Sequence, residues 1–155
     1  MPPGTRRASA GRGPSCMPAG KTFVDTNILA YAQDADSHGK REQSRRLIAA
    51  LAASGLGVIS TQVLQEYYVT ATGKLGVAPL AAKAILRTFD VFEIVQISPR
   101  LIEDAIDCSI LNQLAFWDAL IVTAAAVAGC GMLCSEDFNP GQRILGVRIE
   151  NPFER

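Results

Sequence analysis

The sequence predicts an α/β domain in which helices cover both faces of a central parallel sheet. Short runs rich in β-branched and aromatic residues alternate with longer helical patterns along most of the chain. Helices of ~10–15 residues between such runs are typical of βαβ crossovers, which place neighbouring strands parallel. A length of 155 residues, of which 48% are hydrophobic, suits one domain with a sizeable core.

The first half of the chain is expected to alternate strands with helices. The segment 38–54 is amphipathic, since Leu47, Ile48 and Leu51 form an apolar stripe opposite basic residues. Gly55 and Gly57 end this helix. The expected elements are a strand over 22–24, a helix from about Thr26, a helix over 38–54, a strand over 58–59 and a helix over 61–74.

Proline and glycine mark the element boundaries in the second half. Pro79 and Pro99 suit the first turn of a helix, and Gly129 and Gly131 close a strongly apolar helix. The expected elements are a helix from Pro79 to about Asp90, a strand over 92–97, a helix from Pro99, a helix over 117–128, a buried strand over 132–134 and a last strand over 144–149.

The first 20 residues differ in composition from the remainder, so we expect a basic tail over 1–20 and a folded domain over 21–155. Residues 1–21 hold four basic residues and no acid, amid Pro, Gly and Ser. Such a segment buries too little apolar surface to fold, and we expect it to be disordered. Three interpretations of this segment are open: a nucleic-acid-binding arm, a transit peptide or a misassigned translation start. Met17 stands shortly before the first expected strand, which favours a misassigned start.

Composition excludes several classes of function. Lys plus Arg equals Asp plus Glu at 15 each, so net charge names no nucleic-acid or membrane partner. No apolar run reaches the ~18–20 residues of a membrane span, and four cysteines do not make a disulfide scaffold in a chain this long. We therefore expect a cytoplasmic protein. The phosphate-loop and dinucleotide-binding glycine motifs are both missing, and the single histidine, His38, leaves Ser-His, Cys-His and most zinc chemistry without partners.

Carboxylates stand where a site is expected. Asp25 ends the first strand and Asp137 follows the strand 132–134, and the carboxyl ends of parallel strands border the crevice where ligands bind. Asp118 begins the apolar helix, and Glu66 lies within the helix that starts at Thr61. Each acid also has an ordinary role, in a helix cap, at a helix dipole or in a solvated loop. Glu66 shares a helical face with Gln62, which predicts a surface position.

Four segments resemble the acidic motifs of PIN-domain ribonucleases, above all those of the VapC toxins. The resemblance lies in their order along the chain, their spacing and their places on strands and helices. The four segments are Val24–Asn27, Ser60–Thr61 leading to Glu66, Trp117–Ile121 and Ser135–Phe138. The resemblance spans about Lys21 to Pro152. It implies a three-layer α/β/α fold and a metal-dependent endoribonuclease that leaves 5′-phosphate and 3′-hydroxyl ends. It further implies the toxin of a type II toxin–antitoxin pair, inhibited by a small antitoxin and forming a homodimer.

The same resemblance implies the site residues. The catalytic set is Asp25, Glu66, Asp118 and Asp137, with Asp25, Asp118 and Asp137 as metal ligands. The supporting residues are Thr26, Asn27, Ser135 and Asn139. Whether Glu136 or Asp137 supplies the fourth acid stays open. Four gathered carboxylates repel one another, and Mg²⁺ or Mn²⁺ is the cation that suits oxygen ligands.

Positive charge is needed around such an acidic pocket if RNA is to bind. The candidates are Lys40, Arg41, Arg45 and Arg46, which equally suit the solvated face of an amphipathic helix. Candidates for an antitoxin groove, which core packing explains equally well, are Tyr31, Leu47, Leu51, Tyr67 and Tyr68.

Two other functions compete. One is a non-catalytic PIN-like module that binds RNA or protein. The other is a phosphatase of the haloacid dehalogenase type, whose second aspartate is replaced here by Asn27.

Overall fold

A six-stranded, mostly parallel sheet forms the centre of the computed structural model, which describes residues 20–154. The strand order is β3-β2-β1-β4-β6-β5, with only β5 antiparallel to its neighbour. The strands are β1 (Thr22–Val24), β2 (Gly57–Ser60), β3 (Glu93–Val95), β4 (Met132–Cys134), β5 (Arg143–Ile144) and β6 (Val147–Glu150). The predicted fold class is confirmed. The tail expected over 1–20 lies, apart from Gly20, outside the described residues.

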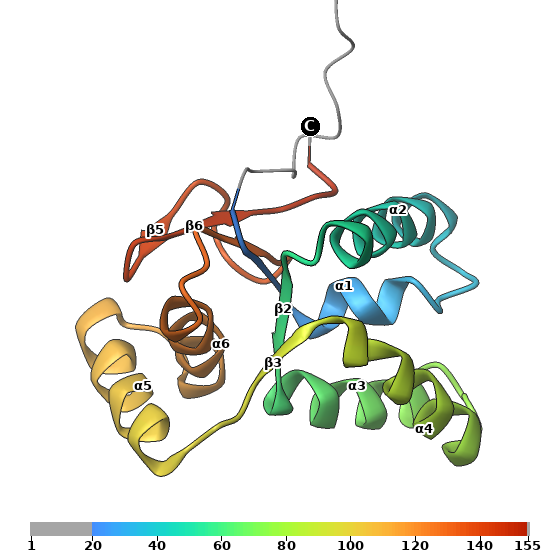
Figure 1. The fold of residues 1–155 in the computed structure, drawn as a ribbon, viewed down its shortest axis with the longest axis horizontal. Coiled ribbons are helices and arrows are strands. Elements are labelled where there is room, and N and C mark those ends of the chain that lie inside the picture. The colour runs from blue at the N-terminus through green and yellow to red at the C-terminus, as the bar shows by residue number, and fades with distance from the viewer. Residues whose placement is uncertain (1–19, 155) are drawn as a thin grey trace, which may run out of the picture.

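Helices α5 and α6 pack together on one side of the sheet, and α1 to α4 gather on the other (Figure 1). The helices are α1 (Thr26–Tyr31), α2 (His38–Ser54), α3 (Thr61–Gly73), α4 (Pro79–Thr88), α5 (Pro99–Asn112) and α6 (Phe116–Val127), with a 3₁₀ turn over Phe89–Val91. Within 20–154 no single helix has the length and apolar composition of a membrane span, although α5 and α6, bent by 114°, meet that test as a pair.

The core lies at the sheet and on the inner faces of the helices. Every residue of β1, β2 and β4 is buried, as expected for strands covered on both faces. Helix α6 is buried from Ala119 to Ala125 because it is packed between the sheet and α5. Its run of small and aliphatic residues therefore reflects burial on most of its circumference.

The end of the chain differs from the prediction. The single strand expected over 144–149 is a hairpin, in which β5 and β6 flank the two residues Leu145 and Gly146. Their φ angles are 51° and 78°, and positive φ at both loop residues is the signature of a type I′ turn. Gly146 supplies this conformation without strain, and Leu145 is held in it by the tight hairpin.

The sheet reverses its direction of growth at β1. The chain passes from β1 to β2 and β3 on one side, then returns to β4 and β6 on the other. A backbone hydrogen bond of 3.0 Å from Asp25 N to Cys134 O joins the carboxyl ends of β1 and β4. In open α/β sheets ligands bind outside the strand ends at such a switch point. Asp25 and the loop after Cys134 lie at this point.

Candidate active site

Asp25 is the buried floor of the site. It is 5% exposed, and it caps α1 because its Oδ1 accepts the Thr26 N–H at 2.7 Å. Its Oδ2 accepts the Ser135 hydroxyl at 2.7 Å. Burial raises the pKa of Asp25 to about 7; the bonds from Ser135 and Thr26 oppose this rise, and the nearby charges of Asp137 and Glu66 add to it.

Glu66 is held by neutral donors from two elements. The Thr26 hydroxyl donates to its Oε2 at 2.7 Å, and Gln62 Nε2 donates to its Oε1 at 2.9 Å. The same Gln62 nitrogen also donates to the Trp117 carbonyl at 3.1 Å, which connects α3 to the start of α6. Helical periodicity predicts a surface position for Glu66, which is half-buried in the structure, and Gln62 on the same helical face is only 3% exposed. Its spacing of four residues from Glu66 is the signal for this pair.

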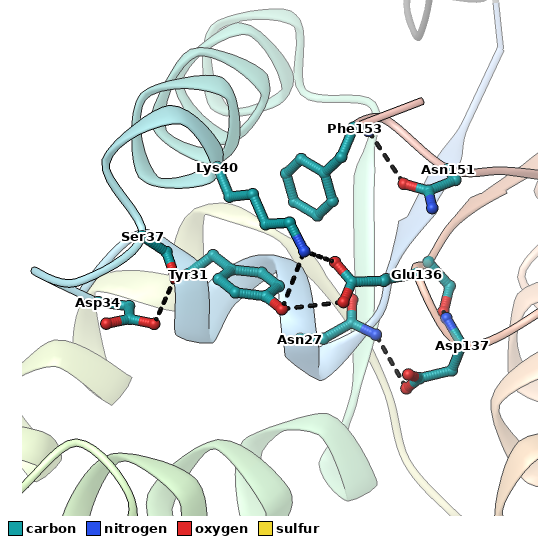
Figure 2. A network of polar contacts seen from close by, with 10 residues as sticks. Asn27, Tyr31, Asp34, Ser37, Lys40, Glu136, Asp137, Asn151 and Phe153 are labelled. Atoms are coloured by element: carbon teal, nitrogen blue, oxygen red, sulfur yellow. Dashed lines mark hydrogen bonds and ion pairs between the residues drawn. The ribbon is translucent and has the colours of Figure 1, made fainter. Parts of the chain in front are cut away.

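The loop after β4 directs two neighbouring acids in different directions (Figure 2). Asp137 Oδ2 accepts Asn27 Nδ2 at 2.9 Å, and the Asp137 N–H donates to Ser135 Oγ at 3.1 Å. Glu136 instead accepts Lys40 Nζ at 2.8 Å and the Tyr31 hydroxyl at 2.9 Å. Asp137 therefore belongs to the acid cluster by position, whereas Glu136 belongs to a separate ion pair.

Two aromatic rings flank the lysine of that partly exposed ion pair. Lys40 Nζ lies 4.7 Å from the centroid of the Tyr31 ring and 5.3 Å from that of Phe153. The two rings meet edge to face at 5.2 Å, and Figure 2 shows the ammonium between them and Glu136. Cation–π contact and the carboxylate together hold Lys40 in place. Sequence patterns gave no signal for this cluster, because its members come from four separate segments.

Asp118 completes the set from the first turn of α6, where a negative charge suits the helix dipole. It is half-buried. Partial burial raises its pKa, and the charges of Asp137 and Glu66 raise it further. The predicted acids Asp25, Glu66, Asp118 and Asp137 thus come from four separate segments and act on one another electrostatically.

The chemistry of this cluster suits a hard divalent cation. Among residues 20–154 no three acidic, histidine or cysteine side chains converge into a ready-made metal site. However, the buried atoms Asn27 Oδ1 and Gln62 Oε1 accept no hydrogen bond. Acceptors in excess of donors beside mutually repelling carboxylates favour a hydrated cation, whose waters donate hydrogen bonds. The residues present therefore fit Mg²⁺ or Mn²⁺.

The remaining supporting residues have different positions. Thr26, Asn27 and Ser135 contact the acids as described above. Asn139 is exposed, and its carbonyl accepts Gln142 N at 3.2 Å in the following turn, so its supporting role stays a prediction.

The four basic residues of α2 do not form one free patch. Lys40 is paired with Glu136, and Arg45 Nε donates to the Ala32 carbonyl at 2.9 Å, at the end of α1. Arg41 is half-buried, while Arg46 is exposed. Contact with RNA stays a prediction for all four. Of the residues considered for an antitoxin groove, Leu47, Leu51 and Tyr67 are buried in the core and unavailable, whereas Tyr31 and Tyr68 keep exposed surface.

A cleft of about 560 Å³ opens beside the acids between α1, α3 and α6. Acidic Glu66 and Asp137 share its wall with apolar surface from Ala30, Val69 and Trp117. Such a volume accommodates a small polymer segment and not only an ion.

The family model described as PIN domain matches residues 22–141. No curated protein sequence matches the chain. Solved structures with this fold include the VapC20 toxin of Mycobacterium tuberculosis, described as cleaving the sarcin-ricin loop (22% identity, TM-score 0.61, covering 76% of this chain and 90% of that one). A toxin–antitoxin complex from Klebsiella pneumoniae is similar (20% identity, TM-score 0.63, covering 87% and 100%). So is DNA-bound VapBC from Salmonella typhimurium (21% identity, TM-score 0.63, covering 86% and 98%). At these identities the likeness shows the fold.

Proposed function

Because this chain belongs to the PIN domain family, we propose that it is a metal-dependent endoribonuclease that acts as the toxin of a type II toxin–antitoxin pair. The observation that carries the proposal is a hydrogen-bond network at the switch point of the sheet. Thr26 contacts both Asp25 and Glu66, and Ser135 contacts both Asp25 and Asp137. The charges of Glu66 and Asp137 also act on Asp118. None of the three ion pairs in the described range neutralises any of these four acids. A structural role alone does not explain unpaired carboxylates gathered at the place where this fold binds ligands.

The protein's own groups have distinct roles in this proposal. Asp25, Asp118 and Asp137 would hold Mg²⁺ or Mn²⁺, and Thr26 and Gln62 orient Glu66 beside them. When bound, the cation supplies an activated water and stabilises charge on the scissile phosphate. Ser135 orients Asp25 and the Asp137 backbone together, since its hydroxyl oxygen contacts both.

One observation favours the alternative of a non-catalytic PIN-like module that binds RNA or protein. The acids are held apart by neutral donors and are not assembled into a three-ligand site within 20–154. A protein that had lost catalysis would show this too. Metal binding and turnover distinguish the two functions.

Purified protein incubated with structured RNA tests the proposal. We expect cleavage with Mg²⁺ or Mn²⁺, products with 5′-phosphate and 3′-hydroxyl ends, and no cleavage in a chelator. Asp118→Asn should abolish cleavage, and Asp104→Asn, which removes the same charge from the exposed face of α5, should not. Cleavage that persists unchanged in chelator contradicts the metal-dependent mechanism.

The proposed partner is a small antitoxin. The similar structure from Klebsiella is a toxin–antitoxin complex, and by analogy we propose such a pairing for this chain, together with homodimerisation. Co-expression with the flanking reading frame followed by size exclusion tests the pairing. Elution of this chain alone, still active on RNA, would argue against a cognate inhibitor.

A further inference from the structure

Trp117 exposes a large aromatic surface beside the acid cluster. It is 64% exposed, and it forms part of the wall of the cleft described above. The Phe116 ring lies 5.0 Å away at an interplanar angle of 65°, which supports the indole from one side. An exposed tryptophan at the mouth of a cleft is unusual for a residue that serves the core, and indicates a surface that meets a ligand.

The backbone of Trp117 is fixed relative to the acids. Asp118 is the next residue in the chain, and the Trp117 carbonyl accepts Gln62 Nε2 at 3.1 Å. The same nitrogen holds Glu66 at 2.9 Å. One buried side chain therefore sets the position of the indole-bearing residue and of an acid, so a molecule reacting at the acids has the indole within its reach.

Charge alone does not draw a polyanion into this cleft. The cleft is lined by the acids Asp34, Glu66 and Asp137, and Lys74 is the one cation among its described lining residues. Affinity for RNA at this place has to come from contacts that do not depend on protein charge. The π face of an indole offers such a contact, because stacking with a base is tolerant of sequence and needs no counter-charge.

Resting on the proposed ribonuclease function, we propose that Trp117 is a stacking platform for an unpaired nucleobase next to the scissile phosphate. A base inside a duplex has both faces covered by its neighbours, whereas a base in a loop or single strand can place one face on the indole. The site therefore selects RNA in which the base beside the cut is unstacked. The exposed face of Trp117 binds that base, and the acids act on the adjacent phosphate.

The fluorescence of Trp117 tests binding without any cleavage, since it is the only tryptophan in the chain. The full-length protein is titrated with a short oligouridylate in the presence of Ca²⁺, with excitation at wavelengths that tyrosine does not absorb. The matched control ligand is a ribose-phosphate oligomer of the same length without bases. We expect saturable quenching by the oligouridylate and no quenching by the abasic oligomer.

Cleavage kinetics of Trp117 variants provide the second measurement. Stacking of one base is worth enough that Trp117→Ala should raise KM by roughly 5- to 100-fold, with a smaller change in kcat. Trp117→Phe should retain most of the affinity, while Trp117→Leu, which keeps apolar area without a π face, should resemble Trp117→Ala. Melting temperatures of the variants verify folding, which the exposure of the side chain makes tolerant of change.

The outcomes separate this proposal from the proposed function. Equal KM values for Ala, Leu and wild type, with no quenching but intact cleavage, overturn stacking and leave the ribonuclease standing. Quenching equal for both oligomers also overturns stacking, because only the backbone would then be sensed. Base-dependent quenching without cleavage in any metal supports the stacking site and overturns the ribonuclease. Neither quenching nor cleavage overturns both.

Discussion

Replacing Asp25 by asparagine should stabilise the metal-free protein, by an amount that grows as the pH rises from about 4 to about 7. Burial raises the pKa of the Asp25 carboxyl to about 7 from an ordinary value of 3.8. Between these values the folded protein keeps a proton that the unfolded chain has released, so the free energy of unfolding falls as pH rises through this window. Below the window the carboxyl causes no penalty, and above it the full penalty applies.

The magnitude follows from the same values. The rise of the Asp25 pKa from 3.8 to about 7 lowers the free energy of unfolding by at most about 4 kcal/mol, since one pKa unit corresponds to about 1.4 kcal/mol. Relaxation of the fold around the charge reduces this penalty. Asparagine keeps the local contacts, since its Oδ1 can accept the Thr26 N–H and its amide can donate to Ser135 Oγ. Asp25→Asn should therefore gain a few kcal/mol near pH ~8 and little near pH ~4.

Denaturant unfolding of both proteins in chelator at the two pH values measures this effect. Asp104→Asn is the control, because it removes an exposed carboxylate of α5 and should change stability equally little at both pH values. A wild-type stability that does not fall between pH ~4 and ~8, or an Asp25→Asn variant no more stable than wild type near pH ~8, would refute the reasoning from burial.

Three further predictions address the site and the core. Asp118→Asn should raise metal-free stability by on the order of 1 kcal/mol by relieving repulsion, and should shrink the rise in melting temperature that Mn²⁺ gives the wild type; equal Mn²⁺ shifts would remove this acid from the site. Lys40→Met should lower stability by only about 0.5–1 kcal/mol, because the ion pair with Glu136 is partly exposed, and a double-mutant cycle with Glu136→Gln measures that coupling. Gly57→Ala should destabilise by about 1–3 kcal/mol in denaturant unfolding, because a methyl group there would overlap the Phe92 ring in the core; a neutral result would show that the ring moves aside at little cost.

Local patterns predicted the fold well where one segment determines its own structure. The strands β1 and β4 and the helices α2 and α6 are continuous runs with a clear pattern, and glycines mark the end of α2 and the connection from α6 to β4. The hairpin of β5 and β6 was merged into one strand, because the apolar pattern continues across Leu145 and only the backbone reversal at Gly146 separates the two strands.

The site was predicted in part, because each contact of the acids joins distant segments. Asp25 is recognisable from its place at the end of an apolar strand. The burial of Gln62 depends on the Trp117 carbonyl 55 positions away, and the pairing of Lys40 with Glu136 spans 96 positions. No local periodicity encodes either contact, so helical patterns predict a solvated face for Lys40 and for the helical face that Glu66 shares with Gln62.

The switch point of the sheet has a consequence for synthesis of the chain. Asn27 and Asp137, which meet in the folded site, are 110 positions apart, and the loop bearing Asp137 is anchored where Ser135 N donates to the Glu150 carbonyl of β6. A nascent chain that has emerged only as far as α4 carries two of the acids but no β4 to align them. Since such long-range pairings form late, a growing chain with this topology cannot assemble its acidic centre. The proposed ribonuclease would in this way be kept from acting on the ribosome that is still translating it.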